Sequence, residues 1–174
     1  PKCGSLERHR LLTLAHQRGV LPFKNREVLH FAPEEIVGRL IDAAEPKRRV
    51  TADILPGRAD LVLDITAIDM PDDSFDTIIA NHILEHVDDA KALAELKRVI
   101  RPGGQIILMI PIIEGWSTSY ENSEVLTDLD RELHYGQRDH VRFFGADFRD
   151  RVHAAGLKLQ EFTADGPDSA KYRL

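Results

Sequence analysis

The sequence predicts an α/β fold: a doubly wound, mostly parallel sheet with helices on both faces, in three layers. The first observation behind this is that short apolar segments alternate with helical patterns along most of the chain. The second is that residues 75–80 are apolar almost throughout, which is typical of a parallel strand buried on both faces. Right-handed crossovers connect successive strands in such a sheet.

The elements follow in order from local signals. Ser5 is placed to cap a first helix, which Gly19 ends. Residues 27–31 form a first strand, and Pro33 suits the opening turn of the next helix, which Pro46 ends. Further strands are expected at residues 49–53, 60–64, 75–80 and 105–110, with a helix over residues 89–99 and a turn at residues 102–104.

The last third of the chain has a weaker pattern. Residues 115–135 are polar and irregular, with a helix expected from Thr127 onward. A helix over residues 145–154, closed by Gly156, precedes a sixth strand over residues 158–163. The residues from Asp165 onward show no periodicity, so we expect no regular element there.

Composition limits the class of protein. With 174 residues, 43% of them hydrophobic and 30% charged, the chain can form one globular domain with a core. The formal net charge of -6 makes nucleic acid an unfavoured partner, because phosphate contacts need clustered lysine and arginine. No apolar run approaches the roughly 20 residues of a membrane helix, and residues 1–10 lack a signal-peptide apolar region. We therefore expect a cytoplasmic protein without a membrane partner, with its oligomeric state open.

The single cysteine, Cys3, excludes an internal disulfide. Its context, Pro-Lys-Cys-Gly, looks like the second half of a C-x-x-C knuckle whose first cysteine would precede Pro1. One thiolate cannot build a tetrahedral zinc site, so the sequence leaves two alternatives, an inert cysteine and a truncated knuckle. We expect residues 1–26 to be a helical lead-in and residues 27–174 to form the main domain.

Candidate binding residues stand where the predicted strands end, because open α/β sheets bind ligands at the carboxyl ends of their strands. Asp53 can accept the two hydroxyls of a ribose. Asp64 can accept an exocyclic amine from adenine, with Ile65 and Ile68 beside the base. Aspartate is also common at strand ends because it stabilises turns, and that alternative stays open for both carboxylates.

A family resemblance becomes visible over residues 64–111. Three successive runs there resemble motifs of the class I S-adenosylmethionine-dependent methyltransferases, in the small-molecule type 11 group. They are Asp72-Asp73-Ser74-Phe75-Asp76, Asn81-His82-Ile83-Leu84-Glu85-His86, and Leu96 to Gly104. The resemblance covers about residues 27–163. It implies a Rossmann-like fold, S-adenosylmethionine as cofactor and a small-molecule methyl acceptor. It also implies a cofactor site that includes Asn81 and His82.

The first loop departs from the family pattern E/D-x-G-x-G-x-G, because the aligned positions His30, Ala32, Glu34 and Ile36 include no glycine. We interpret Phe31, Ala32, Pro33 and Glu34 as an alternative cofactor loop. Ala32 is small, Glu34 can bind the cofactor's ammonium group, and Phe31 can lie beside the sulfonium. The helix dipole after Pro33 favours the methionyl carboxylate. The alternative is a non-catalytic binding domain that keeps only the fold.

A second departure concerns the end of the sheet. The family's sheet is completed by an antiparallel seventh strand, and residues 166–174 contain no such pattern. We therefore expect the seventh strand to be missing from this sequence and the chain to be cut or disordered beyond Leu174.

His82-x-x-Glu85-His86 matches the H-x-x-E-H pattern of a zinc hydrolase, in which two histidines lie on one helical face. Such a site needs a third ligand, and nothing downstream is an obvious candidate. We therefore expect no metal and keep the zinc hydrolase as a third choice. His82 can instead lie over the cofactor, with His86 packed structurally.

A second polar cluster runs from Tyr135 to Arg142, after the fifth strand, where enzymes of this family place substrate-recognition elements. His140 can accept a proton from a hydroxyl or amine acceptor, and His82 is a second catalytic candidate. Arg142 can hold an anionic substrate group, and Tyr135 is a further substrate candidate. The alternative is that Asp139, His140 and Arg142 form a structural hydrogen-bonded corner.

Overall fold

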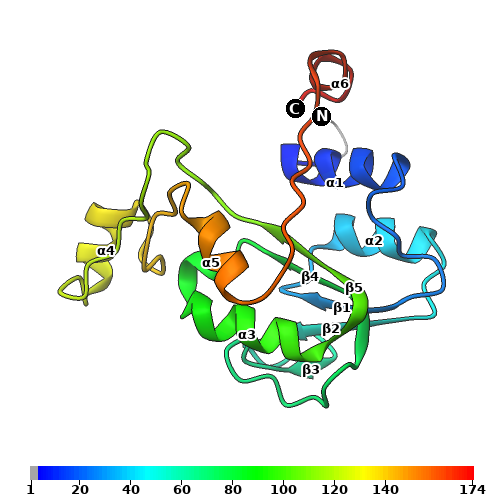
Figure 1. Cartoon of the computed structure of the whole chain (residues 1–174), viewed down its shortest axis with the longest axis horizontal. Coiled ribbons are helices and arrows are strands. Elements are labelled where there is room, and N and C mark those ends of the chain that lie inside the picture. Colours follow the sequence, from blue (N-terminus) through cyan, green and yellow to red (C-terminus); the bar gives the residue numbers. More distant parts are fainter. Residues whose placement is uncertain (1–3) are drawn as a thin grey trace.

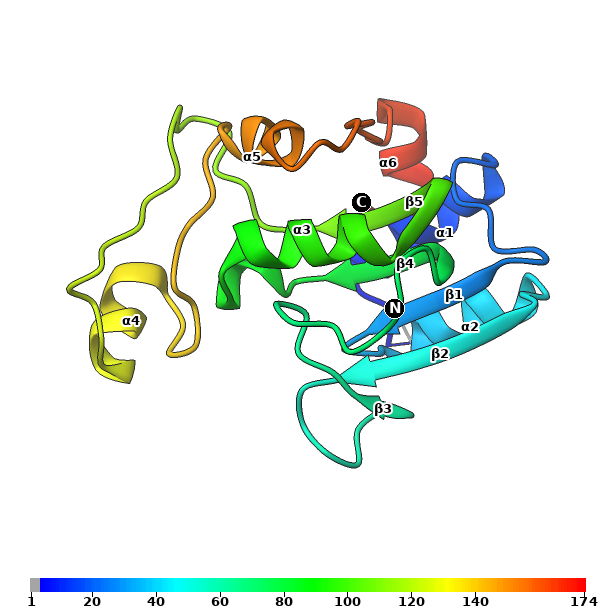
Figure 2. The same ribbon diagram turned by 60° about the horizontal axis from the view of Figure 1, so that its bottom comes forward.

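The computed structural model describes residues 4–174 and contains a five-stranded parallel sheet with strand order β3-β2-β1-β4-β5. Figure 2 shows this order. The strands are β1 (Glu27–Phe31), β2 (Arg48–Asp53), β3 (Leu61–Val62), β4 (Phe75–Asn81) and β5 (Ile100–Met109). The expected Cys3 knuckle lies outside the described residues.

Helices cover both faces of the sheet (Figure 1), which confirms the predicted three-layer, doubly wound α/β architecture. On one face lie α1 (Glu7–Gln17) and α2 (Glu35–Ala43), which contribute Leu12 and Ile41 to a core cluster. On the other face lie α3 (Asp89–Val99) and α5 (Phe148–Ala154), which contribute Leu96 and Phe148 to a larger cluster.

The two central strands form the core, and alternation along β1 divides its side chains between the faces. Val28 packs in the cluster under α1 and α2, and Leu29 packs in the cluster under α3 and α5. In β4, Ile78 and Ile79 divide in the same way, and both are fully buried. This two-sided burial is the reason that the β4 segment is mostly apolar in sequence.

The cap of the first helix differs from the prediction. The N-cap of α1 is Leu6 and not Ser5, and the Leu6 backbone N–H donates to Nδ1 of His9 at 3.1 Å. The histidine at the third helical position therefore accepts the amide of the N-cap residue, which is the reverse contact of a capping box. Gly19 follows the helix with φ +74°, as predicted for a helix stop.

The predicted turn at residues 102–104 is wrong, because β5 begins at Ile100 and runs through it. A register shift between Phe75 and Thr77 accommodates the extra residues. Gly104 is required there, since a Cβ at this position would lie 2.9 Å from the backbone oxygen of Asp76.

The predicted sixth strand is also wrong, because residues 158–163 are extended but pair with no strand among the described residues. Leu159 packs against one core cluster and Phe162 against the other, and Glu161 pairs with Arg149 of α5, so side-chain contacts hold this segment. A short helix, α6 (Gly166–Tyr172), follows where no element was expected. No strand follows β5 in the described part of the chain.

The remaining helix, α4 (Asp128–Tyr135), begins after Thr127, which accepts a hydrogen bond from the Asp130 backbone N–H as an N-cap. It belongs to a long excursion between β5 and α5. Figure 1 and Figure 2 show that α4 stands on the side to which the strand arrowheads point. Among residues 4–174, no helix combines the length and apolar character needed to cross a bilayer.

Candidate functional site

The carboxyl ends of β1 and β4 lie side by side at the point where the strand order reverses, which is where open α/β sheets bind ligands. Each strand is followed directly by a residue with left-handed backbone. Ala32 has φ +42° and its N–H donates to the Ala52 carbonyl at 2.8 Å. His82 has φ +53° and its N–H donates to the Met109 carbonyl at 2.7 Å. Ala32 thus adopts a conformation that a loop glycine would adopt without strain.

Asn81, the last residue of β4, is 8% exposed, and neither polar atom of its amide has a hydrogen-bond partner among the described residues. Buried amides are normally paired, because an unpaired buried polar group costs about 1–3 kcal/mol. An amide with free donor and acceptor at the switch point fits a polar ligand.

The two strand-end aspartates each form a local turn. Asp53 Oδ1 accepts the Leu55 N–H at 2.8 Å, and Asp64 Oδ1 accepts the N–H and hydroxyl of Thr66. In the described residues the Oδ2 atoms make no hydrogen bond, so each carboxylate keeps one oxygen for a ligand. Ile65 is buried at 4% exposure, in the same core cluster as Phe31.

Glu34 is already engaged by the first helix. Arg8 Nη2 donates to Glu34 Oε2 at 2.7 Å, and His9 Nε2 lies 2.5 Å from the same oxygen. Burial alone raises the pKa of Glu34, but the hydrogen bonds from Arg8 and His9 outweigh it and bring the pKa below its usual value. Beside it, Pro33 lines a small surface pocket of about 210 Å³ near the start of α2.

His82 does not form the helical pair that the H-x-x-E-H pattern of a zinc hydrolase needs. Its left-handed backbone separates it from the short 3-10 helix η1 (Leu84–His86). Its Nδ1 lies 3.3 Å from Oε1 of Glu85, and its side chain is 40% exposed. His82 therefore lies outside a two-histidine helical site of that kind.

The structure buries three of the expected polar residues. Arg142 is 6% exposed, and its guanidinium donates to the carbonyls of Leu84 and Val87. Tyr135 is 1% exposed, and its hydroxyl accepts the Asn122 N–H at 2.9 Å. His140 is 5% exposed. Both side chains are thus engaged inside the protein, and the contacts of Arg142 resemble the structural corner of Asp139, His140 and Arg142 that was the alternative left open.

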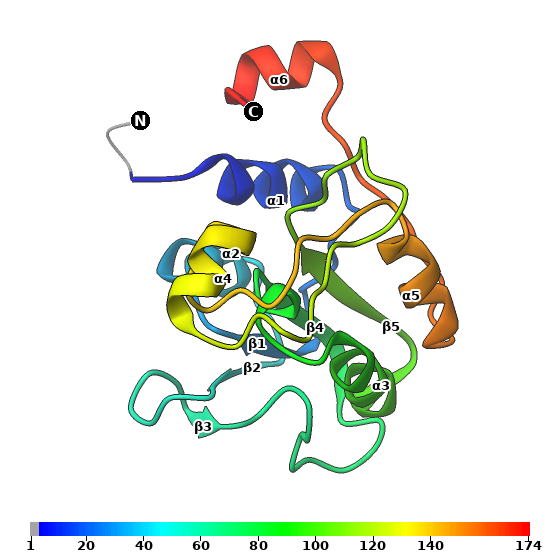
Figure 3. The same ribbon diagram turned by 90° about the vertical axis from the view of Figure 1, so that its left-hand side faces the viewer.

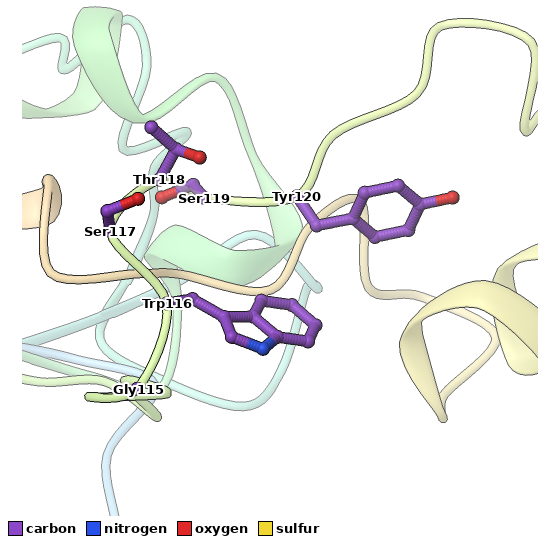
Figure 4. A pocket seen from close by; sticks show the side chains of 6 residues that line it. All are labelled: Gly115, Trp116, Ser117, Thr118, Ser119 and Tyr120. Carbon is purple, nitrogen blue, oxygen red and sulfur yellow. The ribbon is translucent and has the colours of Figure 1, made fainter.

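A surface pocket of about 440 Å³ was not expected from the sequence. It is lined by residues 115–120, in the excursion after β5, and Figure 4 shows its side chains. Trp116 is 41% exposed, and the ring of Tyr120 points toward α4, where its hydroxyl meets His134 Nδ1 at 2.6 Å. An exposed tryptophan in a polar stretch was the signal that could have indicated it.

Residues 35–108 match the family model described as the methyltransferase domain of the type 11 group. Over 63 residues, the chain is 38% identical to an uncharacterised 37.1 kDa protein encoded in a transposon of Streptomyces fradiae. That stretch is 36% of this chain and only 18% of the relative's length.

Three solved structures share the fold. A S-adenosylmethionine-dependent methyltransferase from Mesorhizobium loti is 12% identical with a TM-score of 0.61, over 90% of this chain and 87% of that one. The YcgJ protein of Bacillus subtilis is 19% identical with a TM-score of 0.62, over 90% and 71%. A Burkholderia thailandensis 1,6-didemethyltoxoflavin-N1-methyltransferase, with S-adenosylhomocysteine bound, is 15% identical with a TM-score of 0.55, over 86% and 65%. At these identities the likeness is one of fold. The match over residues 35–108 and the shared fold show that the chain contains a segment similar to the methyltransferase domain and has the fold of S-adenosylmethionine-dependent methyltransferases.

Proposed function

We propose that this chain transfers a methyl group from S-adenosylmethionine to a small-molecule acceptor. The observation that carries the proposal is Asn81, a buried amide with both polar atoms unpaired at the switch point of a methyltransferase-type sheet. The bound S-adenosylhomocysteine of the structurally similar Burkholderia enzyme, which by its name acts on a small molecule, supports the same cofactor here.

The strand ends suggest how the cofactor would be held. Asp53 at the end of β2 would accept the ribose hydroxyls through its free Oδ2, and Asp64 with Ile65 would border the adenine. Ala32 would let the loop backbone approach the methionyl part, beside Asn81 and His82. The first turn of α2, after Pro33 and Glu34, would present free N–H groups to the methionyl carboxylate.

Two of the expected contacts between the first loop and the cofactor, those of Glu34 and Phe31, are not directly available to a ligand. Glu34 would reach the cofactor's ammonium only by sharing its carboxylate with Arg8 and His9, or by leaving them. Phe31 is 3% exposed within the core, so its ring would support the loop from below. We therefore give Asp53 and Asn81 the main binding role.

When bound, S-adenosylmethionine supplies a methyl carbon that its sulfonium already activates. The protein's part is then alignment, which contributes up to roughly 7–11 kcal/mol to lowering the barrier. His82 is the better candidate to accept a proton from the acceptor, because it is exposed at the strand end while His140 is buried. The pocket of residues 115–120 is our candidate for the acceptor side.

Isothermal titration with S-adenosylhomocysteine tests the proposal. We expect one site per chain, with a dissociation constant raised about tenfold or more in Asp53→Ala and Asn81→Ala, since each loses hydrogen bonds worth about 1–3 kcal/mol. Asp69→Ala is the matched control, an exposed aspartate beyond β3 that should bind like the parent chain.

Absence of binding heat and of any thermal shift, in a protein that is folded by circular dichroism, would reject the cofactor site. The non-catalytic binding domain would then be the better account of the fold. Equal binding by the parent chain and both strand-end variants would reject the placement of the site while keeping the binding of the cofactor product.

A further inference from the structure

Three side chains form a cluster next to the proposed cofactor site, and the proposed function gives this cluster no role: Glu85, His86 and His140. One ligand atom from each lies within 4.8 Å of the others. Glu85 and His86 come from η1, at the end of β4, and His140 comes from the loop after α4, 54 residues beyond His86 in the chain. The imidazole rings of His86 and His140 meet edge to face, with centroids 4.6 Å apart.

Two of these groups are buried without the partners that burial requires. Glu85 is 2% exposed, and its Oε2 has no hydrogen-bond donor among the described residues. His140 is 5% exposed, and its Nδ1 also lacks a partner there. A buried ionised carboxylate is costly unless a cation or several donors compensate its charge.

The surrounding charged groups do not supply this compensation. His82 Nδ1 approaches the other oxygen of Glu85, at 3.3 Å. The Arg142 guanidinium lies nearby, but it contacts the carbonyls of Leu84 and Val87 and the carboxylates of Asp89 and Glu121. Glu85 Oε2 therefore points to a cation that the chain itself does not provide.

The orientation of His86 fits a metal ligand. Its Nδ1 lies 3.1 Å from the carbonyl oxygen of Asp139 and 3.3 Å from that residue's Oδ2. A proton on Nδ1, donated to Asp139, leaves Nε2 with a free lone pair. Metal-binding histidines are typically fixed in this way, by a carbonyl or carboxylate on the other ring nitrogen.

We propose that Glu85, His86 and His140 form a binding site for a divalent transition metal ion, with zinc as the best match. Two imidazoles and one carboxylate, with a fourth position open, is a ligand set that zinc accepts, whereas calcium and magnesium prefer oxygen ligands alone. Zinc ligands at about 2.1 Å from the ion lie about 3.4 Å apart, so small side-chain rotations would close the cluster.

Such an ion would do more than neutralise Glu85. The Val141 N–H already donates to the Glu85 carbonyl at 2.9 Å, so the loop after α4 touches η1 through its backbone. A metal bridging His140 to Glu85 and His86 would add a second link between the excursion and the end of β4. We therefore expect metal binding to raise the thermal stability of the chain.

The experiment is titration of Zn²⁺ into chelator-treated protein, followed by calorimetry and thermal unfolding, with Co²⁺ as a spectroscopic probe. We expect one ion per chain, a higher melting temperature, and visible Co²⁺ bands of a low-coordinate site. His86→Gln, His140→Gln and Glu85→Gln should each weaken binding about a hundredfold or more. His153→Gln, an exposed histidine on α5, is the matched control and should bind like the parent chain.

Each variant is first checked for folding by circular dichroism in chelator, and the conservative Glu85→Gln serves if a histidine variant does not fold. Absence of Zn²⁺ binding, or binding that the three variants retain, would overturn the proposal. The titrations contain no S-adenosylhomocysteine, so the metal site and the proposed methyl transfer stand or fail separately.

Discussion

At the residue scale, Ala32 shows how the loop works without glycine. Its φ of +42° lies in the left-handed region, which costs a non-glycine residue roughly 1–2 kcal/mol. Ala32→Gly should remove this strain. The greater conformational freedom of glycine in the unfolded chain should offset about 0.5–1 kcal/mol of that gain in stability. We therefore expect a net gain of up to about 1 kcal/mol in the free energy of unfolding, measured in urea.

The control for this substitution is Ala94→Gly, at an exposed interior position of α3, where glycine should cost about 1 kcal/mol. Opposite signs for the two alanine-to-glycine changes would support the strained turn. A loss at both positions would show that the loop in solution does not hold Ala32 in the left-handed region.

A second residue-scale prediction concerns His30, whose ring is 1% exposed in β1. Burial, and then the charge of Arg49, lower the pKa of His30 to about 4 from its usual 6.5. Between these values the unfolded chain binds more protons than the folded chain, so stability falls as the pH falls from about 6.5 to about 4. Over this pH range, the protonation of His30 lowers the free energy of unfolding by about 3 kcal/mol.

His30→Leu should therefore flatten the loss of unfolding free energy between pH 7 and pH 4.5. The exposed His153→Gln should leave the profile of the parent chain unchanged. Denaturant unfolding at several pH values provides the comparison, and identical acid sensitivity in the parent chain and His30→Leu would contradict the assignment to His30.

At the element scale, the ion pair between Glu34 and Arg8 fastens α1 to the start of α2. Both side chains are partly buried, at 26% and 33% exposure. Glu34→Gln should cost about 1–3 kcal/mol of stability, because it removes a charge-assisted pair and leaves donors of Arg8 and His9 unsatisfied. Urea unfolding at pH 7, where the carboxylate is ionised, measures this loss.

The adjacent Glu35 offers a matched control. Its pair with Arg39 is exposed at 78% and 75%, so Glu35→Gln should cost no more than about 0.5 kcal/mol. Equal costs at the two positions would show that the contact of α1 with the loop contributes little to stability.

At the scale of the whole molecule, protection from amide hydrogen exchange should be greatest in the buried, paired strands of the sheet. We expect the amides of Leu29 and Ile78, in paired and fully buried strands, to exchange about a hundredfold or more slowly than those of residues 158–163. Figure 3 shows α4 standing apart from α3 and α5, and the exposed Leu129 and Leu133 on it should lie in a region of early exchange.

Exchange is read by mass spectrometry of peptides from the labelled chain. Slow exchange over residues 158–163, comparable with that of β4, would mean that this segment forms a paired strand in solution, as its sequence alone suggests. Fast exchange throughout β1 would contradict the sheet order itself.

Much of the fold could be predicted from local pattern. The helix over residues 89–99 has the predicted bounds, because Asp88 caps it and Leu93 and Leu96 repeat on one buried face. The strand ending at Phe31 and the apolar run of β4 were also found, since burial on both faces leaves a direct mark in sequence. The errors in strand assignment fall at residues 102–104 and 158–163, where the decision between turn and strand depends on a neighbouring strand.

The candidate site was less predictable than the fold. Strand ends marked Asp53, Asp64 and Asn81, but nothing local indicated that Arg8 and His9 would engage Glu34 from 25 residues or more away. Likewise, the H-x-x-E-H pattern drew attention to His82, while the third member of the compact cluster proved to be His140. Ion pairs and clusters of this kind join distant segments, and sequence spacing carries no record of them.

By itself, the sequence indicated the family resemblance, the strands and helices up to β5, and the edge of the sheet on which polar residues collect, because each follows from periodicity and from residues close together in the chain. Only the tertiary structure decided which of those polar residues are buried, paired or left without a partner. The physical reason is that burial and electrostatic pairing are properties of side chains brought together from separate elements, and they exist only once the chain has folded.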